Sequence, residues 1–422
     1  MINAIFAGES ALLAFQRQLD VIGNNVANSN TTGFKSQTVG FADLLYQTLQ
    51  LGVAPQGNIG GLNPLQKGLG VRVASISTDF TQGTLTPTGD PFNVAISGNG
   101  FFVLDNGSDQ LFTRDGTFGV NADGFLVHAG TGFFVQRSGT VGEGGAGLPA
   151  FQVGGDNRIV IPPIGTAVPG QATANVTLQG NLDAATPIGG STSSNITIFD
   201  SQGNSHVLTL LFTKTAANTW SISGSIPAAE GNVSPNTIGP VTFNLDGSLA
   251  GPASGSMTVN ITSPTALPPQ VINFDLGNIG GFLGLTQLGG GNSAAATNQD
   301  GFAAGFLNAF NIGNDGIITG TFSNGQTFPI AQLALAVFPN QGGLLRVGDN
   351  FFRVSPASGD PSIGTPLTGG RGSIAGATLE DSNVDLATEL ARLIITQRSF
   401  EVNSDTIRVS SEMLQTAADL IP

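Results

Sequence analysis

Both ends of this chain carry an apolar residue at every seventh position, and this pattern restricts its fold more than any other. A seven-residue repeat forms a stripe on one side of a helix that is too narrow to be stable alone. It predicts helices from Ile2 to about Asn28 and from about Val384 to Leu420. We expect these helices to pair with each other and with those of neighbouring copies. The stripe residues are Ile5, Leu12, Phe15, Leu19, Ile22 and Val26 in the first helix, and Leu386, Leu390, Leu393, Phe400, Ile407 and Leu414 in the second.

A two-helix hairpin inside one subunit is the competing interpretation, because amphipathic helices are usually core elements. The second helix argues against it. Gln397, Ser404 and Ser411 alternate with the apolar residues of its stripe, so two helices alone would bury little apolar area. We therefore favour a larger bundle built from many subunits. Ser382 or Asn383 is expected to cap this helix, with Asp385 in its first turn, where an acid is favoured.

The chain between the helices has the pattern of short strands joined by turns. Asp-Gly and Asn-Gly pairs such as Asn99-Gly100 and Asp315-Gly316 mark hairpins between apolar runs. We expect a mainly β fold with α-helical coiled-coil termini and nested, discontinuous domains. No regular element is assigned to residues 37–70. The expected domains are a terminal helical domain with its connector (1–70 and 379–422), a middle β domain (71–145 and 299–378) and an inserted outer β domain (146–298).

Composition excludes several classes of function. Only 10% of the residues are charged, and the net charge is −14. Nucleic acid is a disfavoured partner, because phosphate binding needs clustered Lys and Arg. Membrane insertion is not expected either, since no apolar run approaches spanning length. The apolar residues near the N-terminus are periodic, and no basic residue precedes Arg17, which argues against a cleaved signal peptide.

No group of residues predicts catalysis. The two histidines, His128 and His206, lie in separate predicted strands without an adjacent carboxylate motif, so structural roles are expected for both. Cysteine is absent, and the sequence contains no P-loop, nucleophile elbow, HExxH motif or calcium loop. We expect no enzymatic activity, no cofactor and no metal.

Two terminal motifs resemble those of bacterial flagellar rod and hook proteins. The N-terminal motif runs from Leu19 through Val26 to Lys35, and the C-terminal motif begins at Ser382. Within this family, the large insertion and the run 197–204 look like hook proteins rather than the shorter distal rod proteins. The residues that carry the resemblance are Asn24, Asn25, Asn28, Gly33 and Phe34, and Asn383, Val384, Asp385, Gln397, Arg398 and Asn403.

The resemblance implies a structural subunit that polymerises into the tubular, flexible flagellar hook, which carries motor torque to the filament. It further implies export through the flagellar type III apparatus and contacts with rod, hook cap and hook-filament junction proteins. The location would be the flagellum, outside the cell. A distal rod subunit is the first alternative, because the connector at about 47–66 resembles that of the rod. A secreted β-rich adhesin is a more distant alternative.

Overall fold

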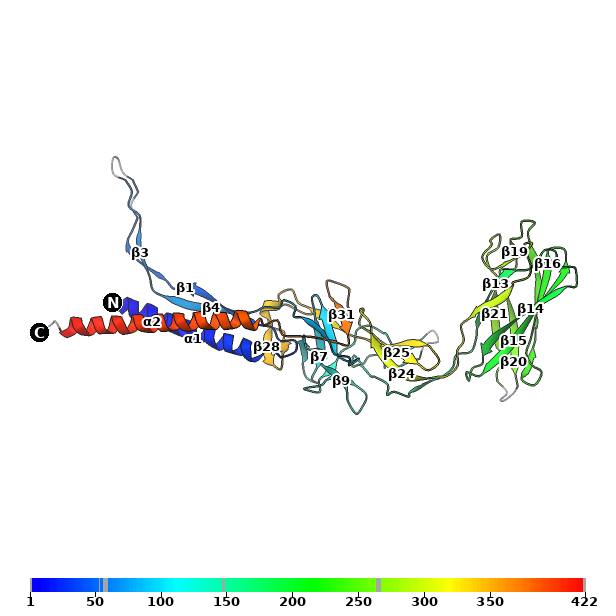
Figure 1. The fold of residues 1–422 in the computed structure, drawn as a ribbon, viewed down its shortest axis with the longest axis horizontal. Helices are drawn as coiled ribbons and strands as arrows, with labels where there is room; N and C mark the ends of the chain where they lie inside the picture. Colours follow the sequence, from blue (N-terminus) through cyan, green and yellow to red (C-terminus); the bar gives the residue numbers. More distant parts are fainter. Residues whose placement is uncertain (1, 53, 56–59, 146–148, 263–266, 420–422) are drawn as a thin grey trace.

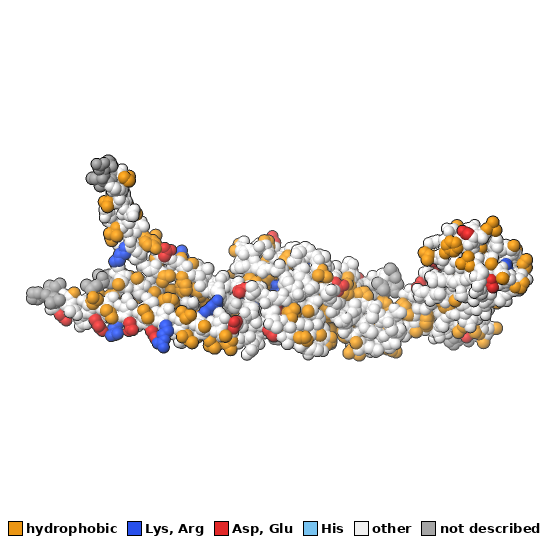
Figure 2. All heavy atoms as spheres, turned by 45° about the horizontal axis from the view of Figure 1, so that its top comes forward, with side chains coloured by type: hydrophobic (Ala, Val, Ile, Leu, Met, Phe, Trp, Pro, Cys, Tyr) orange, Lys and Arg blue, Asp and Glu red, His pale blue; other side chains and the backbone are white. Residues whose placement is uncertain are grey.

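The protein is an elongated rod with both termini at one end (Figure 1). The computed structural model describes residues 2–52, 54–55, 60–145, 149–262 and 267–419. Helices occupy the two ends of the chain and strands fill the part between them, which confirms the expected fold class. Charged side chains gather along the helical end, whereas the visible face of the β domains is mostly uncharged (Figure 2).

The two terminal helices lie antiparallel and side by side (Figure 1). Helix α1 spans Ile2–Ala27 and helix α2 spans Leu386–Asp419. Gly8 permits their close approach, because a Cβ atom there would lie 2.8 Å from Cγ1 of Ile407. The predicted helix extents are confirmed within the described residues, which exclude Leu420.

The predicted cap of α2 is wrong. Asp385 caps this helix: its Oδ1 accepts the Ala387 N–H at 3.0 Å and its Oδ2 accepts the Thr388 hydroxyl at 2.8 Å. These hydrogen bonds, that from Thr388 first, hold the pKa of Asp385 below its usual value. Asn383 is unavailable as a cap because its side chain is bonded to other segments.

The connector after α1 is a long two-stranded ribbon, although the sequence assigned it no regular element. It projects from the helices (Figure 1). Phe15 of α1 meets Phe41 of the ribbon edge to face, with ring centroids 5.9 Å apart. Leu45 and Leu51 are about four-fifths exposed. Its strands are β1 (Gln37–Asp43) paired with β4 (Val71–Thr78), and β2 (Tyr46–Gln50) paired with β3 (Leu65–Gly68).

The middle of the rod combines strands from before and after the inserted segment. Strand β27 pairs with β7, β29 with β8, β31 with β6 and β32 with β5. Phenylalanines such as Phe102 and Phe112 fill the core between them. The strands are β5 (Leu85–Pro87), β6 (Val94–Ser97), β7 (Phe101–Asp105), β8 (Gln110–Thr113), β9 (Phe118–Val120), β10 (Leu126–His128), β11 (Phe134–Val135), β12 (Ala167–Val168), β24 (Gly305–Ile312), β25 (Ile317–Phe322), β26 (Thr327–Gln332), β27 (Leu335–Val337), β28 (Leu345–Gly348), β29 (Phe351–Arg353), β30 (Ser362–Gly364), β31 (Ser373–Gly376) and β32 (Thr378–Glu380), with a short 3-10 helix at Gln341–Gly343.

The outer part, far from the termini, is a sandwich of two sheets (Figure 1). One sheet has the order β14-β15-β16-β18-β19, and the other has β17-β20-β21-β13-β22 with β23 beside β13. Trp220, the single tryptophan of the chain, is fully buried between them. The strands are β13 (Asn175–Asn181), β14 (Ser191–Phe199), β15 (Ser205–Ala216), β16 (Thr219–Ser225), β17 (Gly231–Val233), β18 (Thr237–Phe243), β19 (Leu249–Gly251), β20 (Ser254–Ile261), β21 (Gln270–Asp275), β22 (Leu285–Thr286) and β23 (Ala295–Gln299).

Strand pairing suggests a refinement of the expected domain boundaries. Strand β12 pairs with β24 of the middle part, although the sequence placed it in the outer domain. Strand β4 belongs to the ribbon rather than to the middle domain. We therefore propose boundaries near residues 79 and 169 in place of 71 and 146.

Candidate functional site

The contact face of α1 is wider than the predicted stripe. Among the stripe residues, Ile22 is buried, while Ile5, Leu12, Phe15, Leu19 and Val26 are half-buried. The most buried positions also include Ala11, Ala14 and Val21. The buried face of α1, which α2 and the ribbon cover together, is therefore centred beside the predicted stripe.

The covered side of α2 is not the predicted stripe. Leu393, Ile407 and Leu414 are half-buried, whereas Leu386 (46%), Leu390 (44%) and Phe400 (36%) are exposed. The second row of the predicted stripe, which begins at Leu390 and recurs every seven residues, is exposed. The row one position earlier, Glu389, Thr396, Asn403 and Ser410, is buried or half-buried instead. This row therefore lies on the covered side of α2.

The paired helices leave apolar side chains uncovered. Ile395, Val402 and Val409 recur every seven residues along α2 and are 65%, 64% and 47% exposed. On α1, Phe6 and Leu13 are 59% and 60% exposed. One subunit therefore does not bury all the apolar surface of its own terminal helices.

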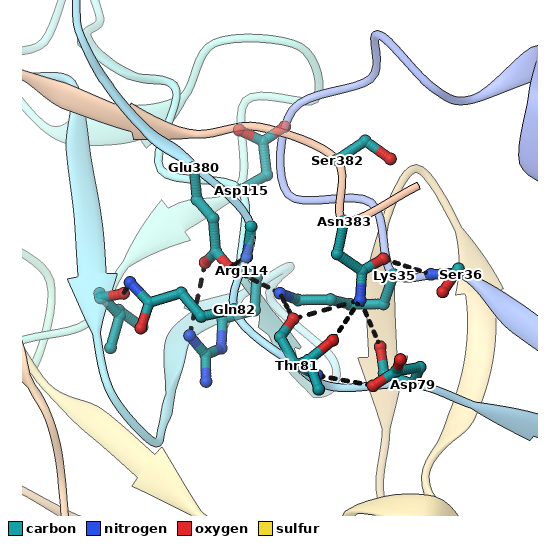
Figure 3. A network of polar contacts seen from close by, with 12 residues as sticks. Lys35, Ser36, Asp79, Thr81, Gln82, Arg114, Asp115, Glu380, Ser382 and Asn383 are labelled. Atoms are coloured by element: carbon teal, nitrogen blue, oxygen red, sulfur yellow. Dashed lines mark hydrogen bonds and ion pairs between the residues drawn. The ribbon is translucent and has the colours of Figure 1, made fainter. Parts of the chain in front are cut away.

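The segments that follow α1 and precede α2 meet at a buried charge cluster (Figure 3). Lys35 Nζ lies 2.6 Å from Oε1 of Glu380, and Arg114 Nη1 lies 3.4 Å from its Oε2. The Gly83 N–H also donates to Oε1 of Glu380, at 2.9 Å. The side chains of Lys35 and Glu380 are fully buried, and burial lowers the pKa values of Lys35 and Arg114 against the opposing effect of Glu380. Glu380 thus joins the N-terminal segment, the middle β domain and the segment that leads into α2.

The side chains of two asparagines from the terminal motifs make hydrogen bonds to backbone groups at this junction. The Ser36 N–H donates to Asn383 Oδ1 at 2.8 Å, and Asn383 Nδ2 donates to the Asp79 carbonyl at 2.9 Å (Figure 3). Asn25, fully buried, exchanges two hydrogen bonds with the backbone of Gln37. The first fixes the entry into α2, and the second fixes the ribbon against α1.

Gly33 and Phe34 also have defined positions in the junction. Gly33 has φ +68°, and a Cβ atom there would lie 2.7 Å from the Asp115 nitrogen. Its N–H donates to the Glu380 carbonyl at 2.7 Å. Phe34 is buried beneath the Arg346 guanidinium, whose Cζ lies 4.9 Å from the ring centroid. Burial also lowers the pKa of Arg346.

The other motif residues lie along the helices around the junction. Asn28 Nδ2 donates to the Asn24 carbonyl at 2.9 Å and closes the end of α1. Val384 is half-buried just before the Asp385 cap. Gln397 and Arg398 are exposed on α2, where Arg398 pairs with Glu401.

Sequence reasoning missed three residues of the junction. Glu380, Arg114 and Arg346 come from three segments far apart in the chain. One sequence signal pointed to them. Charged residues are scarce, so an arginine beside an apolar run, such as Arg114 after Phe112, indicates a buried cation that needs a carboxylate partner. The pairing itself depends on the tertiary fold.

The structure brings carboxylates to both histidines. His128 Nε2 lies 3.3 Å from Asp115 Oδ2. His206 is buried, with Nε2 at 3.3 Å from Asp200 Oδ2 and Nδ1 at 2.7 Å from Glu230 Oε2. These acids are separated from the histidines in sequence, so no local motif revealed them. Across the described ranges, no cluster of three or more His, Asp or Glu side chains suits a metal ion. No described helix is long and apolar enough to cross a membrane.

Asp200 should make the outer domain sensitive to acid. Burial acts to raise the pKa of Asp200, but hydrogen bonds from Asn204, His206 and Gln202 outweigh it and lower this pKa. A lowered folded-state pKa gives stability that is present above the unfolded value of about 3.9 and is lost as the pH falls through the folded value. Asp200→Asn should therefore lower outer-domain stability by about 1–3 kcal/mol at pH 7 and flatten its dependence below about pH 4. Trp220 fluorescence during urea unfolding measures this; an unchanged pH profile would contradict it.

Comparisons with known proteins agree with this architecture. Four family models match in chain order: "Flagella basal body rod protein" at residues 5–35, "Flagellar hook protein FlgE/F/G D1 domain" at 95–184, "Flagellar basal body protein FlaE D2 domain" at 169–302, and "Flagellar basal body rod FlgEFG protein C-terminal" at 375–420. The junction residues from Asn25 to Lys35 and from Glu380 to Asn383 fall inside the first and last models. These matches define the class as the flagellar rod and hook proteins.

Full-length relatives narrow the class. The chain is 36% identical to the flagellar hook protein FlgE of Treponema pallidum, with 100% of both chains covered. It is 35% identical to that of Salmonella typhimurium, over 97% of this chain and 98% of the relative. The chain belongs to the flagellar hook protein family. In fold it also resembles the crystal structure of Helicobacter pylori FlgE2, with TM-score 0.53 and 15% identity over 70% of this chain and 100% of that chain.

Proposed function

We propose that this chain is the self-assembling structural subunit of a bacterial flagellar hook, a flexible tube that carries torque to the filament. The observation that carries the proposal is the apolar surface left uncovered on the paired terminal helices. Ile395, Val402 and Val409 keep a seven-residue spacing, which is the pattern of a helix with a helical neighbour. The hook name of the full-length relatives supports the same function.

An open polymer is consistent with the asymmetry of the subunit. The uncovered rows of α1 and α2 differ in sequence, so a contact between them joins unlike faces of two copies, and such contacts build an open helix when the rotation between copies does not close a ring. We assign the stripe residues of both helices to the inner wall of the tube and the outer β domain to its surface. The rod, the hook cap, the hook-filament junction proteins and the type III export apparatus are proposed partners, and the assembled flagellum outside the cell is the proposed location.

Charge placed on the uncovered rows should stop polymerisation. Phe400→Asp and Val402→Asp each replace an apolar contact by a carboxylate that the assembled bundle would have to bury. We expect the critical concentration for polymerisation to rise more than about 100-fold, which corresponds to about 3 kcal/mol. Sedimentation measures it, and electron microscopy should show curved tubes for the unmodified chain.

The control is Leu245→Asp, which makes a similar change at a 98% exposed residue of the outer domain. It should change the critical concentration only slightly, and all three variants should keep the Trp220 fluorescence of the folded outer domain. Normal polymerisation of Val402→Asp would contradict the proposal. Straight polymers from the unmodified chain would favour a rod subunit instead.

A further inference from the structure

A small pocket lies where α1, the ribbon and α2 meet. Its volume is about 240 Å³. Gln18, Val21 and Ile22 line it from α1, residues 37–39 line it from β1, and Glu389 and Arg392 line it from α2. It is therefore built from the helices that the proposed function places in the assembly contact.

Glu389 is an incompletely satisfied carboxylate in this pocket. The residue is 4% exposed. Its Oε1 accepts a hydrogen bond from Arg392 Nη1 at 2.8 Å. Its Oε2 is buried and has no hydrogen-bond partner among the described residues. A buried charged oxygen without a donor is costly, so the pocket is suited to an additional N–H donor that carries positive charge.

Arg17 offers such a donor. It is the single basic residue of α1, it is exposed, and the described part of the chain provides no ion-pair partner for it. On the same helix, Phe6 and Leu13 are also exposed, at positions eleven and four residues before Arg17. This outward face therefore combines uncovered apolar side chains with an unpaired guanidinium.

We propose that the Glu389 pocket receives the guanidinium of Arg17 from a second copy of the chain. The inference rests on the proposed self-assembly. It names a contact that would fix how the helices of one copy are aligned along those of the next. Each copy presents one Arg17 and one Glu389, so the pair can repeat from copy to copy without closing. Because charged residues are scarce, a charge pair excludes alternative registers in which either partner would be buried alone.

The test is a double-mutant cycle on the full-length chain with Arg17→Gln, Glu389→Gln and the double variant. Loss of one partner of a desolvated charge pair should raise the critical concentration at least about 30-fold. The double variant should polymerise no worse than the weaker single variant, since the interaction is lost only once. Arg408→Gln is the control, because Arg408 pairs with Asp405 and Glu412 of its own helix; it should change the value less than about threefold. Circular dichroism of the monomers checks that the variants keep their helix content.

Cross-linking tests whether the two residues come from different copies. The chain lacks cysteine, so Asp20→Cys, exposed one turn after Arg17, and Thr38→Cys, which lines the pocket, can be prepared separately. After the two are mixed and polymerised, a short dimaleimide should link one copy to the other. If Arg17→Gln polymerised at the same critical concentration as the unmodified chain, the inference would be overturned, and water would be the occupant of the pocket. Additive effects of the two substitutions in the double-mutant cycle would overturn it as well. Failure of the unmodified chain to polymerise would instead overturn the proposed function.

Discussion

Glu380→Gln should destabilise the junction between the terminal helices and the middle domain by about 3–5 kcal/mol. The substitution removes the carboxylate that faces Lys35 and Arg114, and both cations then stay buried without an anion. The amide oxygen can still accept the Lys35 and Gly83 hydrogen bonds, but the amide NH2 then faces the Arg114 guanidinium, so two donors meet where a carboxylate oxygen accepted. A loss of this size is a large fraction of the 5–15 kcal/mol that stabilises an ordinary domain.

Hydrogen exchange followed by mass spectrometry measures this effect locally. In Glu380→Gln, protection should fall in residues 33–36, 79–83 and 378–383, which the cluster holds together. Trp220 fluorescence should report an unchanged outer domain, because that residue lies in a separate core. Asp381→Asn is the matched control: Asp381 is exposed and accepts one hydrogen bond from Thr86, so its loss should cost less than about 1 kcal/mol. Equal effects of the two substitutions would contradict the assigned role of the cluster.

Gly33→Ala should also destabilise the junction strongly. The added Cβ would lie 2.7 Å from the Asp115 nitrogen and 2.9 Å from the Arg114 carbonyl carbon, which are backbone atoms that cannot turn aside. The φ of +68° adds about 1 kcal/mol of strain for alanine. The backbone would have to shift, and the Gly33 hydrogen bond to the Glu380 carbonyl would weaken with it. We expect a loss of about 2–4 kcal/mol, read from exchange of the same segments.

Gly23 provides the matched control for Gly33. It lies in α1, and a Cβ atom there would meet nothing within 4 Å. Gly23→Ala should stabilise the helix of the monomer by up to about 1 kcal/mol, because alanine is the better helix former. If both substitutions lowered protection equally, the close approach of Gly33 to residues 114–115 would not be the cause.

The helices could be predicted because their signals are local. Each signal can be read within a short stretch of the sequence. These signals are the seven-residue repeat, the polar segment after Ala27 and the strand-like pattern between the ends. The ribbon was missed for the opposite reason. Its strands pair across a proline- and glycine-rich segment, and neither β2 nor β3 has a buried face that would impose alternation.

The junction, too, could be predicted only in part from the sequence. The motifs singled out Asn25, Gly33 and Asn383 but gave no reason for their identities. That reason lies in partners distant in sequence: Gln37, Asp115 and Ser36.

By itself, then, the sequence determined the kind of elements, their order and the two terminal motifs, because hydrophobic periodicity and turn residues act over short stretches of chain. Tertiary structure decided which face of α2 meets α1, and it decided that Glu380 neutralises two cations from other segments. Burial is shared between segments distant in sequence, so the row of α2 that begins at Glu389 could be recognised as its covered side only once α1 and the ribbon were placed beside it.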